Sequence, residues 1–372
     1  MAPEGAKPAP DTQRRRPMSE QELNQRPEGS MLAAVMYGAR DVRLEQRPIP
    51  KVGPEEVLVK IVAIGVCGSD VHFYWDGRIG KRVVRKPMIL GHESAGIVVA
   101  VGENVTLVKV GDRVALEPGI PCRRCSYCKT GHYNLCPDVA FMAAPHTDGA
   151  MREYFKTPED LLFKLPDNMS FEDGTLVEPL SVGVYAARRG RIVPGDRVVI
   201  LGAGTIGLMV LQAVKVYGAA RRVVIDLQAD RLEMAKKLGA TEVINPREQD
   251  PDKIIEELMP GGCDVVMEAA GAVPTIQMAT RLVRKGGRIV FLGMPGVDEV
   301  PVNMLDIIVK EVDVMGMFRY NNVYGEAVRM ISEGLVEVRS LHTHTYPLEQ
   351  AAEAIEKAHA CEVGTIKVII KP

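Results

Sequence analysis

The first part of the chain consists of short apolar runs separated by turn residues. Residues 57–62 (VLVKIV) are rich in β-branched side chains, and residues 95–101 form a second apolar run that ends at the turn residues 102–104. Runs of this length between turn residues are typical of strands rather than helices. From Met31 to about Val114, the pattern therefore predicts a β-rich, barrel-like domain.

The pattern changes at residues 194–196 (PGD), where strand-like and helix-like segments begin to alternate. Residues 197–201 (RVVIL) form a buried-strand run, a glycine turn follows, and residues 208–217 have the apolar spacing of a helix. Such alternation indicates parallel strands joined by crossover helices, so we predict an α/β fold with a doubly wound parallel sheet. Further segments of this kind are expected over 222–226, 231–238, 242–244, 253–258, 264–267, 275–283, 288–292 and 312–317.

This pattern divides the chain into four predicted segments. We expect an N-terminal tail over 1–30, a β-rich domain over 31–182, an α/β domain over 183–320, and a C-terminal segment over 321–372 that returns to the β-rich domain. The tail holds five prolines, a run of three arginines at 14–16 and few large apolar residues, so we predict that it is disordered.

Composition and charge exclude several classes of protein. The 372 residues are 46% hydrophobic and 25% charged, with a net charge of −2 and mixed signs along the chain. This is typical of a soluble globular protein, and no basic stripe predicts binding to nucleic acid or to an anionic membrane. No apolar run reaches the ~18 residues of a membrane span. The seven cysteines suit metal binding in a reducing compartment better than a disulfide framework, so we expect a cytoplasmic protein.

Four of the cysteines form the pattern C-x2-C-x2-C-x7-C. Two residues between cysteines allow a tight turn to direct both sulfurs to one point, and four thiolates complete a tetrahedral zinc site. Because such a site leaves no position for a substrate, we predict a structural zinc. Its ligands would be Cys122, Cys125, Cys128 and Cys136.

A glycine-rich turn predicts a dinucleotide site. The motif G-x-G-x-x-G spans residues 202–207 (GAGTIG) between a strand and a helix, and Asp226 ends the next strand, nineteen residues after Gly207. Asp226 would accept hydrogen bonds from the adenosine ribose and repel a 2′-phosphate, so we predict NAD rather than NADP; the nearby Arg231 weakens this preference. The expected cofactor contacts are Gly202, Gly204, Ile206, Gly207, Asp226 and Arg231.

A second group of side chains could hold a catalytic metal. Cys67, the run Gly91-His92-Glu93 and Glu178 combine sulfur, nitrogen and oxygen ligands, as an open catalytic zinc site requires. This constellation predicts a zinc separate from the four-cysteine site, and therefore two zinc ions per subunit.

The sequence around His92 resembles a known signature. The pattern G-H-E-x2-G-x5-G-x2-V is met over residues 91–105, and it resembles that of the zinc-containing medium-chain dehydrogenases. Three further runs resemble the sorbitol and polyol dehydrogenase branch: GVCGSDVH at 65–72 with GRIG at 77–80, EPLSV at 178–182, and FRYN at 318–321. The resemblance covers about Met31 to Pro372. It implies a GroES-like catalytic domain, a Rossmann NAD-binding domain and a homo-oligomer, most often a tetramer.

The same resemblance implies roles for individual residues. The catalytic zinc would be held by Cys67, His92 and Glu93, with Glu178 at the zinc or at its water; which glutamate is the closer ligand stays open. Ser69 and His72 would belong to a proton relay, with Glu178 as the alternative proton acceptor. Arg319 and Tyr320 match the substrate-contacting pair of the branch, and Phe73 and Phe141 would line the pocket. Phe73 replaces a tyrosine that sorbitol dehydrogenases usually have.

The expected activity is zinc-dependent transfer of a hydride from a secondary hydroxyl group of a polyol to NAD+, which gives a ketose. Sorbitol, xylitol and arabinitol all stay open as substrates. One alternative is a threonine or secondary-alcohol dehydrogenase of the same superfamily. Another is a non-catalytic, crystallin-like or regulatory protein that has kept the fold.

Overall fold

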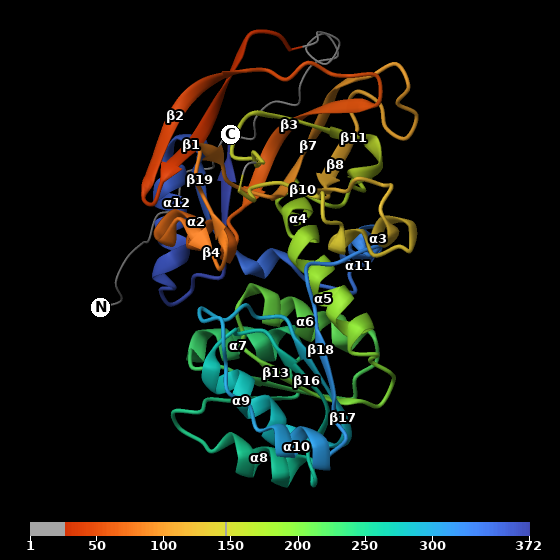
Figure 1. The fold of residues 1–372 in the computed structure, drawn as a ribbon, viewed down its shortest axis with the longest axis vertical. Helices are drawn as coiled ribbons and strands as arrows, with labels where there is room; N and C mark the ends of the chain where they lie inside the picture. The colour runs from red at the N-terminus through yellow and green to blue at the C-terminus, as the bar shows by residue number, and fades with distance from the viewer. Residues whose placement is uncertain (1–26, 146) are drawn as a thin grey trace, which may run out of the picture.

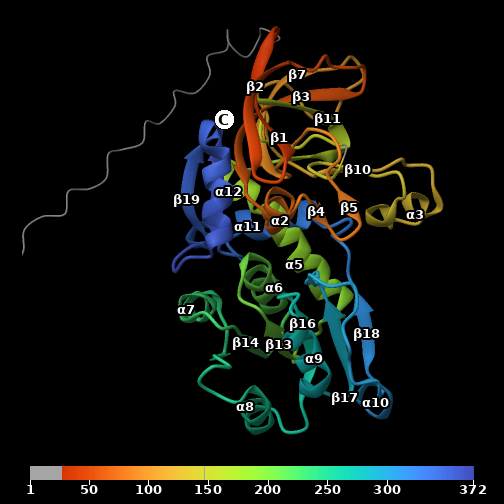
Figure 2. The ribbon, with the colours of Figure 1, turned by 60° about the vertical axis from the view of Figure 1, so that its left-hand side comes forward.

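The computed structural model describes residues 27–372 except residue 146, and the predicted N-terminal tail lies outside these residues up to position 26. The chain forms a β-rich half and a half built on a parallel sheet, joined by long helices that run between them (Figures 1 and 2). This arrangement confirms the predicted α/β class with a separate β-rich barrel-like domain.

The β-rich half is organised around one long, buried strand, β3 (Glu56–Gly65), which pairs with three others. In the described residues its seven-stranded sheet has the order β12-β8-β7-β3-β20-β19, and β11 also pairs with β3. Two of these strands come from the C-terminal segment, so the two ends of the sequence meet in one sheet. The other strands are β7 (Glu93–Val101), β8 (Arg113–Leu116), β11 (Tyr154–Pro158), β12 (Leu162–Lys164), β19 (His342–Pro347) and β20 (Lys367–Lys371).

Smaller strands complete this half. A three-stranded sheet has the order β2-β1-β6, and β4 with β5 and β9 with β10 form two short two-stranded sheets. Their bounds are β1 (Ser30–Gly38), β2 (Asp41–Pro48) and β6 (Met88–Ile89) for the three-stranded sheet, and β4 (Arg78–Ile79), β5 (Arg82–Val83), β9 (Gly119–Ile120) and β10 (Ala140–Phe141) for the two-stranded sheets.

The second half contains a six-stranded parallel sheet in the described residues, with the order β15-β14-β13-β16-β17-β18. The chain starts at the centre of the sheet, moves outward to β15 and returns to the other side, which is the doubly wound topology predicted. The strands are β13 (Arg197–Leu201), β14 (Arg221–Ile225), β15 (Glu242–Ile244), β16 (Cys263–Glu268), β17 (Val283–Phe291) and β18 (Asp313–Gly316).

The helices cover the parallel sheet and connect the halves. The predicted boundary at 182/183 falls inside α5 (Val177–Arg189), a continuous helix that packs against both α6 and α11 in one buried apolar cluster. The division of the chain into segments 1–30, 31–182, 183–320 and 321–372 is therefore our proposal. The other helices are α2 (Gly68–Asp76), α3 (Ser126–Lys129), α4 (Phe171–Thr175), α6 (Thr205–Val216), α7 (Ala229–Leu238), α8 (Pro251–Leu258), α9 (Val273–Leu282), α10 (Met304–Val309), α11 (Tyr324–Ser332) and α12 (Ala351–Ala360).

None of these helices, within the part of the chain that is described, has the length and apolar character needed to cross a membrane.

Candidate active site and metal centres

The mixed ligand set predicted for a catalytic metal is assembled where β3 ends and β7 begins. Cys67 is the N-cap of α2, two residues after β3, and His92 and Glu93 stand at the start of β7. Their ligand atoms all lie within 4.8 Å of one another. Gly65 is paired with Glu93, and a Cβ at Gly65 would meet the Glu93 Oε2 at 2.1 Å, so only glycine leaves room for this carboxylate. Sulfur, imidazole and carboxylate donors at this separation fit a zinc ion.

Asp70 joins the two loops that carry these ligands, although the sequence pattern gave no indication of it. Its fully buried carboxylate accepts hydrogen bonds from the backbone N–H groups of Cys67 (2.9 Å) and Gly91 (3.0 Å). It also lies 3.8 Å from the His92 Nδ1. A carboxylate behind a ligating histidine orients the ring and strengthens it as a ligand.

The charge around His92 also favours a cation. Burial alone would lower the pKa of His92, but the neighbouring Cys67 and Asp70 raise this pKa to about 10. Without a metal the imidazole would therefore hold a proton that stabilises its negative neighbours. Because a ligating histidine must be neutral, metal binding at this site releases that proton.

Lys367 is a further residue that sequence reasoning missed. From β20, its Nζ donates to both carboxylate oxygens of Glu93, at 2.9 and 2.7 Å, and to the carbonyl of Val66 at 3.0 Å. Both side chains are almost fully buried, at 3% and 1% exposure. The pair holds Glu93 in place and brings a positive charge close to the metal ligands.

Glu178 lies in the first turn of α5 and is buried beside this cluster. It does not belong to the group formed by Cys67, His92 and Glu93, whose ligand atoms all lie within 4.8 Å of one another. Burial raises the pKa of Glu178 to about 7. The Tyr320 hydroxyl donates to its Oε1 at 2.8 Å, which fixes the orientation of the carboxyl group. The structure thus brings together Cys67, His92, Glu93, Glu178 and Tyr320.

The other predicted catalytic and pocket residues have different surroundings. Ser69 is half-buried in the first turn of α2, whereas His72 is exposed on that helix, with its Nδ1 3.4 Å from Asp76. Phe73 is buried in the apolar core of the β-rich half. His72 is therefore exposed to solvent rather than buried with the metal ligands, and the role of Phe73 in the pocket stays a prediction.

Phe141 and Arg319, in contrast, lie next to the ligands. The Phe141 ring centroid is 5.6 Å from that of His92, and the Arg319 guanidinium carbon is 3.5 Å from the centre of the same phenylalanine ring. Arg319 has a left-handed backbone (φ 55°), a conformation that costs a non-glycine residue roughly 1 kcal/mol. This conformation places its side chain and that of Tyr320 on the same site.

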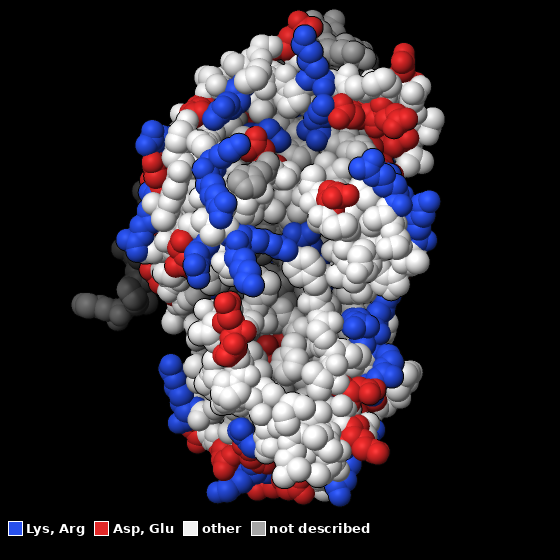
Figure 3. Space-filling model, in the orientation of Figure 1, with Lys and Arg blue, Asp and Glu red and all other residues white. Residues whose placement is uncertain are grey.

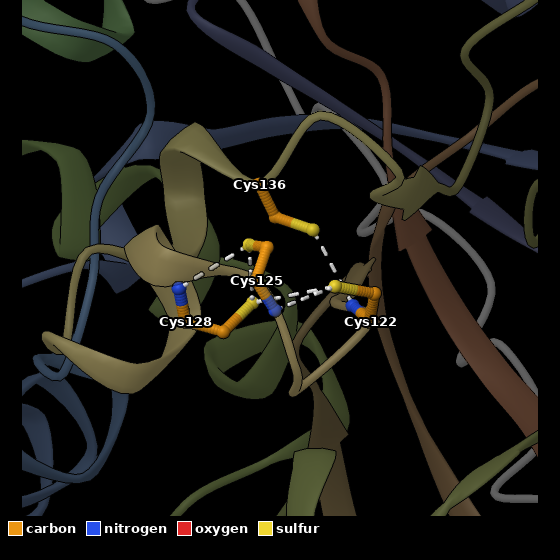
Figure 4. A group of neighbouring side chains, drawn as sticks. All are labelled: Cys122, Cys125, Cys128 and Cys136. Atoms are coloured by element: carbon orange, nitrogen blue, oxygen red, sulfur yellow. Dashed lines mark hydrogen bonds between the residues drawn. The ribbon is translucent and has the colours of Figure 1, made fainter.

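The four clustered cysteines lie close together on the loop that contains α3, and Figure 4 shows their sulfur atoms directed toward one point. Their sulfurs all fall within 4.8 Å of one another, and the backbone N–H of Cys128 donates to the Cys125 Sγ at 3.5 Å. Backbone N–H groups from residues 124 and 125 lower the pKa of Cys122 to about 6, which favours its thiolate. Four convergent sulfurs with this support fit a closed, structural zinc.

The glycine turn between β13 and α6 has the geometry of a dinucleotide site. Gly202 has φ 101°, and a Cβ at Gly207 would lie 1.9 Å from the Gly202 carbonyl oxygen, so both positions require glycine. At Gly204 a Cβ would meet only Arg231, at 3.9 Å, so the backbone there is open to a ligand. The turn and the first N–H groups of α6 fit a pyrophosphate.

Asp226 stands at the end of β14 beside this turn. Its carboxylate accepts hydrogen bonds from the backbone N–H groups of Ala203 (2.6 Å) and Gln228 (2.9 Å), which hold it at the rim of the site. Arg231, from α7, approaches Gly204, and its buried Nε has no hydrogen-bond partner among the described residues. Ile206 is only partly buried and packs against the apolar cluster below.

Comparison with known proteins identifies both halves. Residues 53–167 match the alcohol dehydrogenase GroES-like domain, and residues 205–333 match the zinc-binding dehydrogenase family. The chain is 46% identical to the sorbitol dehydrogenase of Bacillus subtilis (strain 168), over 92% of this chain and 98% of that protein. It is 44% identical to the sorbitol dehydrogenase of Mus musculus, over 92% and 96% of the two chains.

Solved structures agree with this match. An oxidoreductase/dehydrogenase of unknown specificity from Escherichia coli has a TM-score of 0.88 at 41% identity and covers 92% of this chain and 99% of that chain. The L-idonate 5-dehydrogenase of Escherichia coli has a TM-score of 0.87 at 29% identity, over 93% and 99% of the two chains. These findings confirm the predicted family resemblance. The chain therefore belongs to the zinc-binding dehydrogenases, the zinc- and NAD-dependent oxidoreductases that include the sorbitol dehydrogenases.

Proposed function

We propose that the protein oxidises a secondary hydroxyl group of a polyol to a ketone, with NAD+ as the acceptor, and so produces a ketose. The observation that carries this proposal is the cluster of Cys67, His92 and Glu93 beside the buried Glu178–Tyr320 pair. It combines a ligand set for an open zinc with a proton acceptor and hydrogen-bonding groups that suit hydroxyls.

The metal would be held by Cys67, His92 and Glu93, with Glu178 next to it. Zinc, when bound there, is a Lewis acid that lowers the pKa of an alcohol oxygen. Asp70 orients His92, and Lys367 holds Glu93, so two residues behind the ligands keep the site assembled. We assign Glu93 rather than Glu178 as the closer ligand, because only Glu93 has a carboxylate oxygen within 4.8 Å of the ligand atoms of both Cys67 and His92.

In this proposal Glu178 accepts the proton of the substrate hydroxyl. A group whose pKa lies near the operating pH is the most effective general base, and the pKa of Glu178 is raised to about 7. The Tyr320 hydroxyl holds one carboxyl oxygen and leaves the other available. The carbon loses its hydrogen with both bonding electrons to the nicotinamide of NAD+, and the C–O bond becomes a carbonyl. Because His72 is exposed on α2, we start the proton relay at Glu178 and not at His72.

NAD+ would bind along the glycine turn at residues 202–207, with Asp226 at the adenosine ribose. Arg231 stands close enough to Gly204 to contact the phosphates, which is consistent with its unpartnered Nε. The Asp226 carboxylate, held by two backbone donors, would repel the 2′-phosphate of NADP.

The substitution Cys67→Ser tests the catalytic assignment. We expect NADH formation from sorbitol, xylitol or arabinitol to fall below detection and the zinc content to fall from two ions to one, while circular dichroism stays unchanged. Cys361→Ser, at the exposed end of α12, is the matched control and should behave as the wild type. Wild-type turnover by the Cys67→Ser protein with one zinc would refute the proposal. Faster turnover of threonine or simple secondary alcohols than of any polyol would favour the alternative dehydrogenases.

We also propose that the protein is a homo-oligomer, with a tetramer as the expected state. The strand β18 forms one edge of the parallel sheet, and the adjacent α10 exposes large apolar side chains, a combination that favours burial against another chain. They include Met304, Leu305, Ile308 and Val309, each more than half exposed. Light scattering on the wild type and on Ile308→Glu tests this: the variant should dissociate, and a monomeric wild type would contradict the proposal.

A cytoplasmic location is part of the same proposal, because metal-ligating thiols are maintained in reducing compartments.

A further inference from the structure

A cavity of about 660 Å³ opens beside the proposed active site, and its charged lining is entirely basic. The cationic side chains are Lys81, Arg82, Arg85 and Arg319, and the lining includes no aspartate or glutamate. In Figure 3, lysine and arginine side chains gather across the middle of the visible face, above the hollow between the two halves. We name this cavity, with its four cations, the basic cavity.

The inner wall of the basic cavity is shared with the catalytic cluster. Phe141 and Arg319 both line it, the Phe141 ring is 5.6 Å from the His92 ring, and Arg319 directly precedes Tyr320, which donates to Glu178. The basic cavity is therefore placed to receive the far end of a substrate whose hydroxyl group is held at the metal ligands. The opposite wall belongs to the four-cysteine lobe, through residues 134–137.

The four cations are only weakly offset by carboxylates of the protein, of which Glu178 acts on Arg319. Within the part of the chain that the structure describes, none of them has a carboxylate oxygen within 4.0 Å. Arg82 and Arg319 approach the same Phe318 ring, with their guanidinium carbons 5.1 and 4.7 Å from its centre. Burial, with the positive charge of Arg82, lowers the pKa of Arg319 to about 10. Like charges gathered in this way favour an anionic ligand.

Arg319 also offers a donor that nothing satisfies. Its Nη1 is buried and has no hydrogen-bond partner among the described residues, and a buried donor of a charged group is costly to leave unpaired. A guanidinium group binds carboxylates and phosphates through two parallel hydrogen bonds. No residue of the 202–207 turn lines the basic cavity, so the pyrophosphate that this turn would hold is not the anion bound there.

We propose that the preferred substrate is an anionic polyol derivative, which carries a carboxylate or phosphate group at the end far from the oxidised carbon. The basic cavity binds this group, and Arg82 with Lys81 and Arg85 determines the preference for it over a neutral polyol. This inference rests on the proposed function and narrows its substrate class. The reaction itself is unchanged: the secondary alcohol becomes a ketone, NAD+ becomes NADH, and the anionic group is not altered.

The test compares three six-carbon substrates that differ in charge: sorbitol, gluconate and sorbitol 6-phosphate. For the wild type we expect kcat/KM for at least one of the two anions to exceed that for sorbitol by about tenfold or more, with the difference decreasing as salt is added. A preference for gluconate would identify a carboxylate, and a preference for sorbitol 6-phosphate would identify a phosphate. In Arg82→Gln the ratio of anionic to neutral kcat/KM should fall by about tenfold, and Arg82→Lys should restore part of it.

Arg78→Gln is the matched control, because Arg78 is an exposed arginine on the same hairpin that does not line the basic cavity. It should leave the ratio at its wild-type value. The inference is overturned if sorbitol is used as well as both anions, or if Arg82→Gln lowers kcat/KM for charged and neutral substrates equally. It is also overturned if the main effect of Arg82→Gln is a higher KM for NAD+. If neither neutral nor anionic polyols are oxidised by zinc-replete enzyme, the proposed function itself has failed.

Discussion

The buried ion pair between Lys367 and Glu93 gives the sharpest test of how the site is held together. Lys367→Met removes a cation that donates to both Glu93 oxygens and to the Val66 carbonyl. With both partners at 3% exposure or less, no water replaces the lost hydrogen bonds. Loss of one partner of such a pair leaves an uncompensated buried charge, which costs about 3–5 kcal/mol. We expect that loss in the free energy of unfolding of the zinc-free protein.

A double-substitution cycle separates the charge from the loss of packing. In Glu93→Gln the carboxylate becomes neutral and Lys367 is left as the uncompensated buried charge, so adding Lys367→Met to Glu93→Gln should cost less than about 1 kcal/mol or restore stability, because it removes that charge. The difference between the two backgrounds is the coupling between the charges. Substitution of the exposed Lys253, which pairs with Asp250 at 3.7 Å on the surface, is a control that should change stability by less than about 1 kcal/mol.

The assay is urea unfolding in the presence of a chelator, followed by tryptophan fluorescence. Trp75 is the only tryptophan in the chain, and it stacks on His359 between α2 and α12 of the β-rich half, so its signal reports the half that contains Lys367. Two results would refute the reasoning that Lys367 and Glu93 form a buried, interacting charge pair. One is a loss of less than about 1 kcal/mol in the free energy of unfolding of Lys367→Met. The other is that Lys367→Met costs the same free energy in the wild type and in the Glu93→Gln background.

Three further predictions follow from the site. Burial raises the pKa of Glu117 from 4.5 to about 7, so the folded state binds its proton more tightly than the unfolded state; this contribution to stability is complete below about pH 4.5 and is lost as the pH rises through 7. The two pKa values differ by about 2.5, which corresponds to at most about 3–4 kcal/mol of stability, and Glu117→Gln should remove this pH dependence from urea unfolding curves. In Asp226→Ala the KM for NAD+ should rise about ten- to hundredfold while that for NADP+ falls, as measured by initial rates. In Cys136→Ser, metal analysis should give one zinc per chain, because one of the four clustered sulfurs is lost. The KM for substrate should also rise about tenfold, because the lobe without its zinc no longer positions Asn134 to donate to the carbonyl of Phe318.

Residues close in sequence and tied by local geometry were predicted best. The four-cysteine site lies within fifteen residues, and the glycine turn within six, so the spacing alone limits where the sulfurs and N–H groups can point. His92 and Glu93 were grouped with the distant Cys67 and Glu178 because these side chains together offer sulfur, nitrogen and oxygen ligands, and only the family resemblance assigned their individual roles.

The helix α2 shows what the sequence reading missed. Because α2 starts directly after Cys67, successive side chains rotate around the helix axis by about 100° each. Asp70, Phe73 and Tyr74 point to the interior, while His72 points to solvent beside Asp76. Proximity to Cys67 in the sequence therefore did not bury His72 with the ligands, whereas Asp70, which the sequence analysis did not single out, reached them.

The sequence by itself determined the class of fold and the family, and it located the four-cysteine pattern and the glycine turn, because each of these patterns is short and strictly spaced. Only the tertiary structure decided that Lys367 meets Glu93 across 274 residues and that Tyr320 reaches Glu178 across 142. It also placed Arg319 beside Lys81, Arg82 and Arg85, a distant stretch of the chain, around one cavity. These contacts arise where β20 joins β3 and where the halves close on each other, and such long-range packing depends on the whole buried core rather than on any local pattern.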